Sequence, residues 1–106
     1  MADFLGLMKQ ATQMQQKIEA LQAELGELTI EGNAGGGVVV VRLSGKGDLK
    51  SVTIDPTLMK PDEKEIIEDL LVAAHADARR KTEGVLQDKM KQLTGGLPLP
   101  PGLKLF

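Results

Sequence analysis

Three consecutive glycines followed by four consecutive valines constrain this chain more than any other stretch. The run is Gly35-Gly36-Gly37-Val38-Val39-Val40-Val41. Glycine adopts positive φ at little steric cost, whereas β-branched side chains favour extended backbone. The run therefore predicts a tight turn that enters a strand, which we place at residues 38–44 in the middle of a sheet.

Two further segments, one on each side of this strand, alternate between apolar and polar residues. A second glycine turn over residues 45–48 leads into an alternating segment at 49–55, so this segment and the valine strand form a hairpin. Upstream, residues 28–31 alternate in the same way and predict a shorter strand that leads into the glycine run. Together the three segments predict a three-stranded antiparallel meander.

A long helix is predicted before the sheet, over residues 4–26, with Asp3 as its N-cap and Gly26 as its end. Its apolar residues recur at alternating spacings of four and three, which is a heptad pattern. This seam comprises Phe4, Leu7, Ala11, Met14, Ile18, Leu21 and Leu25. The helix would span roughly 35 Å, at about 1.5 Å per residue. A compact domain of about 100 residues has a radius of gyration of only about 13 Å. We therefore expect part of this helix to project or to meet a partner.

A second long helix is predicted after the sheet. Asp55-Pro56 ends the last strand, because proline lacks the N–H that the ladder requires. Asp62 is the expected N-cap, with Glu65 in the capping-box position, and the helical pattern continues to about Leu93. Small residues in its middle allow another backbone to approach closely: Ala73, Ala74, Ala76 and Ala78.

Charge is divided along this second helix. Residues 62–77 carry six acids and one lysine, a balance of −5, whereas residues 79–91 carry five basic residues and two acids, a balance of +3. This order complements the helix dipole and by itself requires no ligand. It also contains a run of three cations, Arg79, Arg80 and Lys81, in an otherwise acidic chain. The basic residues can therefore serve the helix dipole or bind a ligand, and both explanations stay open at this point.

Length and composition set further bounds. The 106 residues support a single domain, with residues 1–94 as its folded body and 95–106 as a proline-rich, extended tail. The absence of cysteine excludes disulfides and thiolate metal sites and fits a reducing cytoplasm. No apolar run is long enough to span a membrane, so we expect a soluble, untargeted cytoplasmic protein. The net charge of −2 argues mildly against a polyanionic partner.

No residue pattern indicates catalysis, a cofactor or a small-molecule substrate. His75 lies among alanines, where Asp69 and Asp77 cannot complete a metal site. The glycine run lacks the lysine and hydroxyl residue of a phosphate loop and enters a strand instead of a helix. With two phenylalanines as the only aromatic residues, stacking platforms for single-stranded nucleic acid are missing. By elimination, we expect a binding or scaffolding role.

In order and spacing, these segments resemble the YbaB/EbfC family of bacterial nucleoid-associated proteins over essentially the whole chain. The matching pieces are Leu7-Met8-Lys9-Gln10-Ala11, Met14-Gln15, the glycine run before the valines, Val52-Thr53-Ile54-Asp55-Pro56-Thr57-Leu58, Leu70-Leu71-Val72-Ala73-Ala74, Asp77-Ala78-Arg79-Arg80-Lys81, Met90 and Gly96-Leu97-Pro98-Leu99-Pro100-Pro101-Gly102. The resemblance implies an α+β fold and a tweezer-like homodimer whose projecting helices hold double-stranded DNA. It carries no catalytic residues.

The preferred interpretation is a dimeric, nucleoid-associated protein that alters DNA conformation. We place its DNA contacts on Lys9, Arg79, Arg80 and Lys81, and no metal or cofactor is expected. The residues assigned to the core or the dimer seam are Leu7, Met14, Ile18, Leu21, Leu25, Ala74 and Ala78. The alternative is a non-catalytic module that grips a replication or recombination protein. Binding to DNA should weaken steeply with salt, whereas an apolar groove for a protein helix should tolerate salt.

Overall fold

The glycine run forms the turn that the sequence predicts. In a computed structural model of the protein, which describes residues 3–94, the φ angles of Gly35, Gly36 and Gly37 are 65°, 74° and 96°. Such positive values are strained for residues with a Cβ atom. The turn connects strand β1 (Ile30–Ala34) to strand β2 (Val39–Leu43).

The predicted antiparallel meander is confirmed, with β2 between β1 and strand β3 (Leu49–Ile54). Gly32 of β1 lies opposite Val41, and Val41 lies opposite Val52 of β3. The predicted bounds of the first strand were wrong, because β1 begins at Ile30 and continues through Gly32 to Ala34. Alternation of apolar and polar side chains could not show this, since Gly32 has no side chain to bury.

The core lies between the sheet and helix α2 (Lys64–Thr94), which packs on β1 and β2. Val39, Val41 and Leu43 point toward α2 and are fully buried. Ala74 and Ala78 are also fully buried, as members of the same cluster. A Cβ atom on Gly32 would lie 2.2 Å from the backbone nitrogen of Ala78. The backbone that approaches Ala74 and Ala78 closely is therefore strand β1 of the same chain.

The start of α2 differs from the prediction. Two short 3₁₀ helices, η1 (Pro56–Leu58) and η2 (Pro61–Glu63), precede it. Asp62 lies inside η2 and is therefore not an N-cap. The N-cap of η2 is Lys60, whose side chain makes no capping hydrogen bond. Pro61 explains the difference, because its fixed φ suits the first helical position and the turn begins there.

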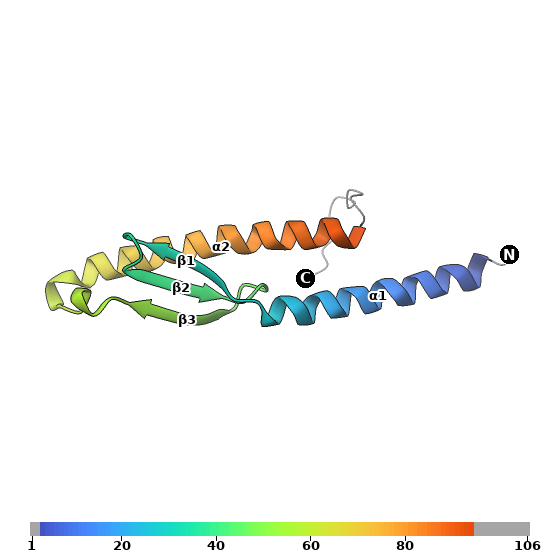
Figure 1. Ribbon diagram of the computed structural model, residues 1–106, viewed down its shortest axis with the longest axis horizontal. Helices are drawn as coiled ribbons and strands as arrows, with labels where there is room; N and C mark the ends of the chain where they lie inside the picture. Colours follow the sequence, from blue (N-terminus) through green and yellow to red (C-terminus); the bar gives the residue numbers. More distant parts are fainter. Residues whose placement is uncertain (1–2, 95–106) are drawn as a thin grey trace.

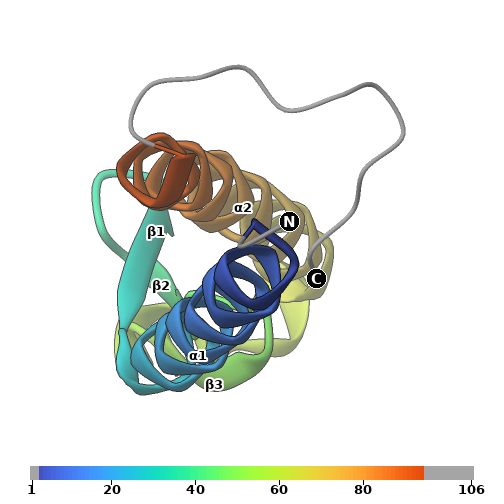
Figure 2. The same cartoon turned by 90° about the vertical axis from the view of Figure 1, so that its right-hand side faces the viewer.

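Helix α1 (Asp3–Glu27) projects far from the sheet, as expected, so that the molecule measures 72 × 23 × 18 Å (Figure 1). Seen along the long axis, its N-terminal end stands nearest the viewer (Figure 2). The predicted N-cap was wrong, because Asp3 lies inside α1, and the helix ends at Glu27, one residue after the predicted end at Gly26. Leu25 is 1% exposed, whereas Leu7 is 63% exposed.

The predicted proline-rich tail, residues 95–106, lies outside the described part of the chain. Between residues 3 and 94, no helix is both long and apolar enough to cross a membrane.

Candidate nucleic-acid interface

The structure distributes the four predicted DNA-binding cations over different surfaces. Arg80 and Lys81 both form ion pairs with Asp77, at 3.3 and 3.1 Å. Lys81 Nζ also donates to the backbone carbonyl of Glu31 at 3.1 Å. These two cations therefore face the β1 edge of the sheet.

Asp77 is the centre of this cluster. Its Oδ2 accepts a hydrogen bond from the backbone N–H of Asn33 at 3.0 Å. This bond, followed by the hydrogen bond from Lys81, lowers the pKa of Asp77 below its usual value. The ionised carboxylate offsets one of the two neighbouring positive charges. The Arg80 side chain is nevertheless 70% exposed, so its guanidinium group is accessible to a phosphate.

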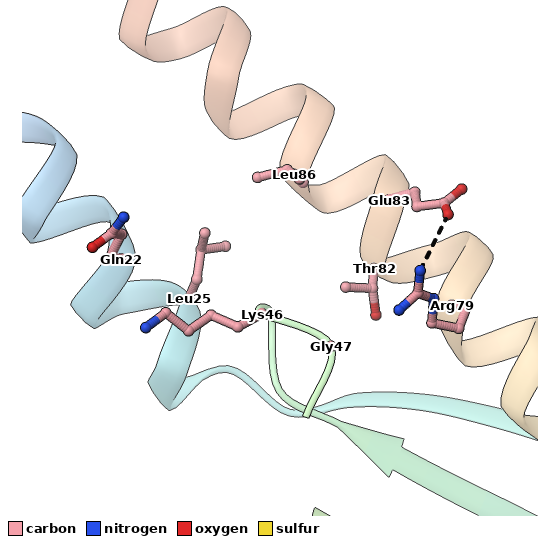
Figure 3. A pocket seen from close by; sticks show the side chains of 9 residues that line it. Gln22, Leu25, Lys46, Gly47, Arg79, Thr82, Glu83 and Leu86 are labelled. Carbon is pink, nitrogen blue, oxygen red and sulfur yellow. Dashed lines mark ion pairs between the residues drawn. The ribbon is translucent and has the colours of Figure 1, made fainter. Parts of the chain in front are cut away.

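Arg79 points to a different surface, because successive residues of a helix are rotated by about 100°. It lines a cavity of about 380 Å³ between α2, the C-terminal end of α1 and the β2–β3 turn (Figure 3). Arg79 forms an ion pair with Glu83, one turn further along α2, at 4.0 Å. At that separation, with both side chains more than half exposed, the pair is weak.

A second cation at this cavity, Lys46, was not among the predicted site residues. Gly45 N–H donates to the Leu25 carbonyl at 2.8 Å, which holds the β2–β3 turn against the end of α1. Ser44 Oγ accepts the backbone N–H groups of Lys46 and Asp48, each at 3.2 Å. The turn is thereby fixed, and it carries Lys46 to the cavity (Figure 3).

The sequence held only a weak signal for Lys46. A cation between two glycines in a hairpin turn is well presented to a ligand. Its proximity to the cavity of Arg79 depends on how the turn docks on α1, and the local sequence does not show this.

Lys9 lies far from the other predicted cations. It precedes Leu25 by sixteen residues on α1, which corresponds to about 24 Å along the helix axis. Lys9 and Arg79 therefore cannot hold the same phosphate. Only an extended ligand, such as a duplex, could reach both side chains.

Helices α1 and α2 face each other across an ion pair and a shallow cleft. Lys89 pairs with Glu24 across the gap between the two helices. Both residues of this pair line a shallow cleft of about 250 Å³ between the two helices. Its lining residues are Lys17, Ala20, Leu21, Glu24, Lys89, Gln92 and Leu93.

An apolar groove of about 310 Å³ lies beside α2, above β3. It exists because α2 packs on β1 and β2 and leaves the α2-facing side of β3 open. Leu49 and Val72 in its wall are 60% and 71% exposed. The other lining residues are Val41, Val52, Leu71 and His75. His75 thus lies in an apolar wall, and the described residues contain no group of acids and histidine that could hold a metal ion.

The predicted seam divides into two parts. Leu21, Leu25, Ala74 and Ala78 are buried within this chain. Ile18 is half-buried, whereas Leu7 and Met14 are exposed on the projecting half of α1.

Comparison with known proteins gives a consistent result. The sequence profile of the YbaB/EbfC DNA-binding family matches residues 1–97. A protein named nucleoid-associated protein from Rhodopseudomonas palustris (strain BisB5) is 62% identical over 105 residues, covering 99% of each chain. A protein of the same description from Bradyrhizobium sp. (strain ORS 278) is 61% identical over 102 residues, covering 96% of each chain.

The fold also matches a solved structure. An uncharacterized Helicobacter pylori protein superposes with a TM-score of 0.75 and 24% sequence identity. The match covers 84% of this chain and 94% of that one. At this identity the likeness concerns the fold alone.

Proposed function

This chain belongs to the YbaB/EbfC DNA-binding family, and we propose that it is a nucleoid-associated protein that binds double-stranded DNA as a homodimer and alters its conformation. Effects on nucleoid organisation and gene expression would follow from the altered DNA. The observation that carries the proposal is the family match over residues 1–97, which includes every helix and strand of the described chain. The proposed activity takes place in the bacterial cytoplasm and needs no catalytic step or cofactor.

The groove above β3 supports a second copy of this chain as the dimer partner. Acidic residues dominate α2 before Asp77 and basic residues dominate it after Ala78, and the groove lies near this boundary. A two-fold axis near His75 would place a second α2 antiparallel to the first. Each acidic half would then face a basic half, and the exposed Leu49 and Val72 would be covered.

Light scattering tests the dimer and its proposed interface together. We expect a mass of about twice 11.4 kDa for the unmodified protein. Val72→Asp should dissociate it into folded protomers, because the charge would be desolvated in the interface but not in the separate chain. Leu5→Asp makes a matched change at an exposed position on α1 and should leave the dimer intact. If the unmodified protein is a folded monomer at micromolar concentration, the proposed dimer is contradicted.

The DNA contacts in this proposal are Lys9, Arg79, Arg80 and Lys81, with Lys46 added from the cavity. Lys81 contributes mainly charge, because its Nζ is held by Asp77 and by the Glu31 carbonyl. In a homodimer each cation occurs twice, and the two Lys9 side chains lie on projecting helices. This arrangement suits contacts spread along a phosphate backbone.

A salt titration of duplex binding tests the proposed function. With about two to four phosphate contacts per protomer, the logarithm of the affinity should fall against the logarithm of salt concentration with a slope of roughly −4 to −7 for the dimer. Binding that stays unchanged between low and moderate salt would contradict phosphate recognition.

The alternative function is a protein-interaction module that grips a replication or recombination protein. The exposed apolar side chains on the outer half of α1 favour it, because such a surface fits a helix or an extended peptide. Salt-tolerant capture of one defined partner, together with absence of duplex binding at low salt, would decide for this alternative.

A further inference from the structure

The cavity between α1, α2 and the β2–β3 turn has the size of a small-molecule site. Its volume is about 380 Å³, near the lower end of the range of about 300–1,000 Å³ that ligand pockets span. The proposed DNA contacts use only its two cations, Lys46 and Arg79, and its apolar interior has no part in them. The interior therefore needs an explanation of its own.

Apolar side chains dominate this interior. Leu25 from α1 and Leu86 from α2 project into the space between the two helices (Figure 3). Thr82, also in the wall, is 7% exposed, and its hydroxyl donates to the Ala78 carbonyl at 2.8 Å. Because that hydroxyl proton is used within α2, the interior offers a ligand mainly apolar contact.

Backbone contacts hold the walls of the cavity in place. Gly45 N–H donates to the Leu25 carbonyl at 2.8 Å, and a Cβ atom on Gly45 would lie 2.7 Å from that oxygen. Gly47 has a φ angle of 92°, and a Cβ atom on it would lie 3.4 Å from Arg79 Nη1. The turn thus packs against both the end of α1 and the Arg79 guanidinium group, so the cavity is preformed.

The charged groups of the cavity are two cations, Lys46 and Arg79, and one acid, Glu83, which leaves a net charge of +1. Glu83 lies 4.0 Å from the Arg79 guanidinium, and this weak pair leaves other N–H groups of Arg79 to a second acceptor. The side chains of Lys46 and Arg79 lie on opposite sides of the turn (Figure 3). Arg79 can therefore bind both oxygens of a carboxylate, while Lys46 adds positive charge from the side of α1.

We propose that this cavity binds a small carboxylic acid anion with an aliphatic body. Its carboxylate pairs with Arg79, and its hydrocarbon chain lies between Leu25 and Leu86. The net charge of +1 matches one carboxylate, whereas a phosphate monoester carries about −1.5 to −2 at pH 7. One consequence rests on the proposed function: a carboxylate held by Arg79 would exclude a DNA phosphate from it.

Titration of the full-length protein with octanoate, without DNA, tests the site. The amide resonances of Gly45 and Gly47 should shift and saturate, whereas that of Gly36, in the β1–β2 turn, should not move. Acetate supplies the charge alone, and 1-octanol supplies the chain alone. Octanoate should bind more tightly than either, because each buried methylene tightens binding by about fourfold and a charged hydrogen-bond partner by about tenfold or more.

Substitutions test the role of the cations. Arg79→Gln should weaken octanoate binding by about tenfold or more, and Lys46→Gln should weaken it less, because Lys46 acts from a greater distance. The control Lys60→Gln removes the same charge between η1 and η2, outside the cavity, and should bind octanoate like the unmodified protein. Melting temperatures verify that each variant is folded.

Three results would overturn the proposal. The first is octanoate binding that is no tighter than that of acetate or 1-octanol, and the second is equal affinity of Arg79→Gln and Lys60→Gln for octanoate. The third is a set of resonance shifts confined to the groove above β3, which would place the hydrocarbon chain there. Because these titrations contain no DNA, their failure would leave the proposed function standing.

Discussion

The backbone N–H of Asn33 donates a hydrogen bond to Asp77 Oδ2 at 3.0 Å, which joins edge strand β1 to the middle of α2. Two residues before Asn33, the carbonyl of Glu31 accepts from Lys81 Nζ at 3.1 Å. The same two side chains, Asp77 and Lys81, are paired with each other. Helix α2 therefore satisfies one donor and one acceptor on the outer edge of the sheet, and it protects that edge from pairing with another strand.

Asp77→Asn should destabilise the protein in a pH-dependent way. The folded-state pKa of Asp77 lies below its ordinary value of 3.8, so between the two values the unfolded chain binds more protons. The contribution of Asp77 is thus fully present above about pH 5 and disappears as the pH falls through the folded-state pKa. Urea unfolding of both proteins between neutral and acidic pH measures this difference.

Asp69→Asn is the matched control, because Asp69 lies on the same helix and is exposed. Its effect on the free energy of unfolding should be small at every pH. A constant difference between Asp77→Asn and the unmodified protein, from neutral to acidic pH, would show that the Asn33 bond does not act through the ionised carboxylate.

Gly32→Ala should be more damaging than Gly36→Ala. A Cβ atom at Gly32 would lie 2.2 Å from the Ala78 nitrogen, so α2 would have to move away from the sheet, at about 3 kcal/mol or more. At Gly36 the added atom meets open space, and the penalty is the positive φ alone, about 1–2 kcal/mol. Urea unfolding compares the two variants, and equal losses would contradict close packing at Gly32.

Fold prediction from sequence succeeded where the signal was local. The glycine and valine run determined the β1–β2 turn and the middle strand, because positive φ and β-branching act within a few residues. The continuation of β1 through Gly32 and the start of α2 were misjudged. In the first case the decisive contact joins Gly32 to Ala78, far along the chain, and in the second Pro61 outweighed Asp62.

The candidate site was harder to predict for the same reason. The sequence identified Arg79, Arg80 and Lys81 as one run, but a helix directs consecutive side chains to different surfaces. Asn33 and Glu31, which engage the Asp77 and Lys81 side chains, come from a strand more than forty residues away. Lys46 reaches the cavity of Arg79 only because the β2–β3 turn docks on the end of α1.

Leu25→Ala and Leu5→Ala should separate the two ends of α1. Leu25 is fully buried, and its truncation should lower the free energy of unfolding by about 2–5 kcal/mol. Leu5 is exposed, and its truncation should change stability by no more than about 0.5 kcal/mol. Thermal or urea unfolding measures both, and a small loss for Leu25→Ala would mean that the end of α1 does not pack on the β2–β3 turn at Gly45.

The last prediction distinguishes the cations that contact DNA from those that only carry charge. Each of three substitutions removes one positive charge: Lys46→Gln, Arg79→Gln and Arg80→Gln. The control Lys60→Gln does the same between η1 and η2, just before α2. The start of α2 lies at the end of the sheet away from α1 (Figure 1). All four variants change the net charge equally, so a difference between them reports position.

For a cation that contacts phosphate, the salt slope of duplex binding should flatten by about 0.9 per contact, or about 1.8 for a dimer that loses two. We expect a flatter slope and weaker binding to every DNA sequence for Lys46→Gln, Arg79→Gln and Arg80→Gln. For Lys60→Gln we expect no change of slope. Melting temperatures should stay close to that of the unmodified protein, because these side chains are exposed. Equal slopes for all four variants would place the DNA contacts elsewhere. The basic residues of α2 would then only complement the helix dipole and, through Lys81, bind strand β1.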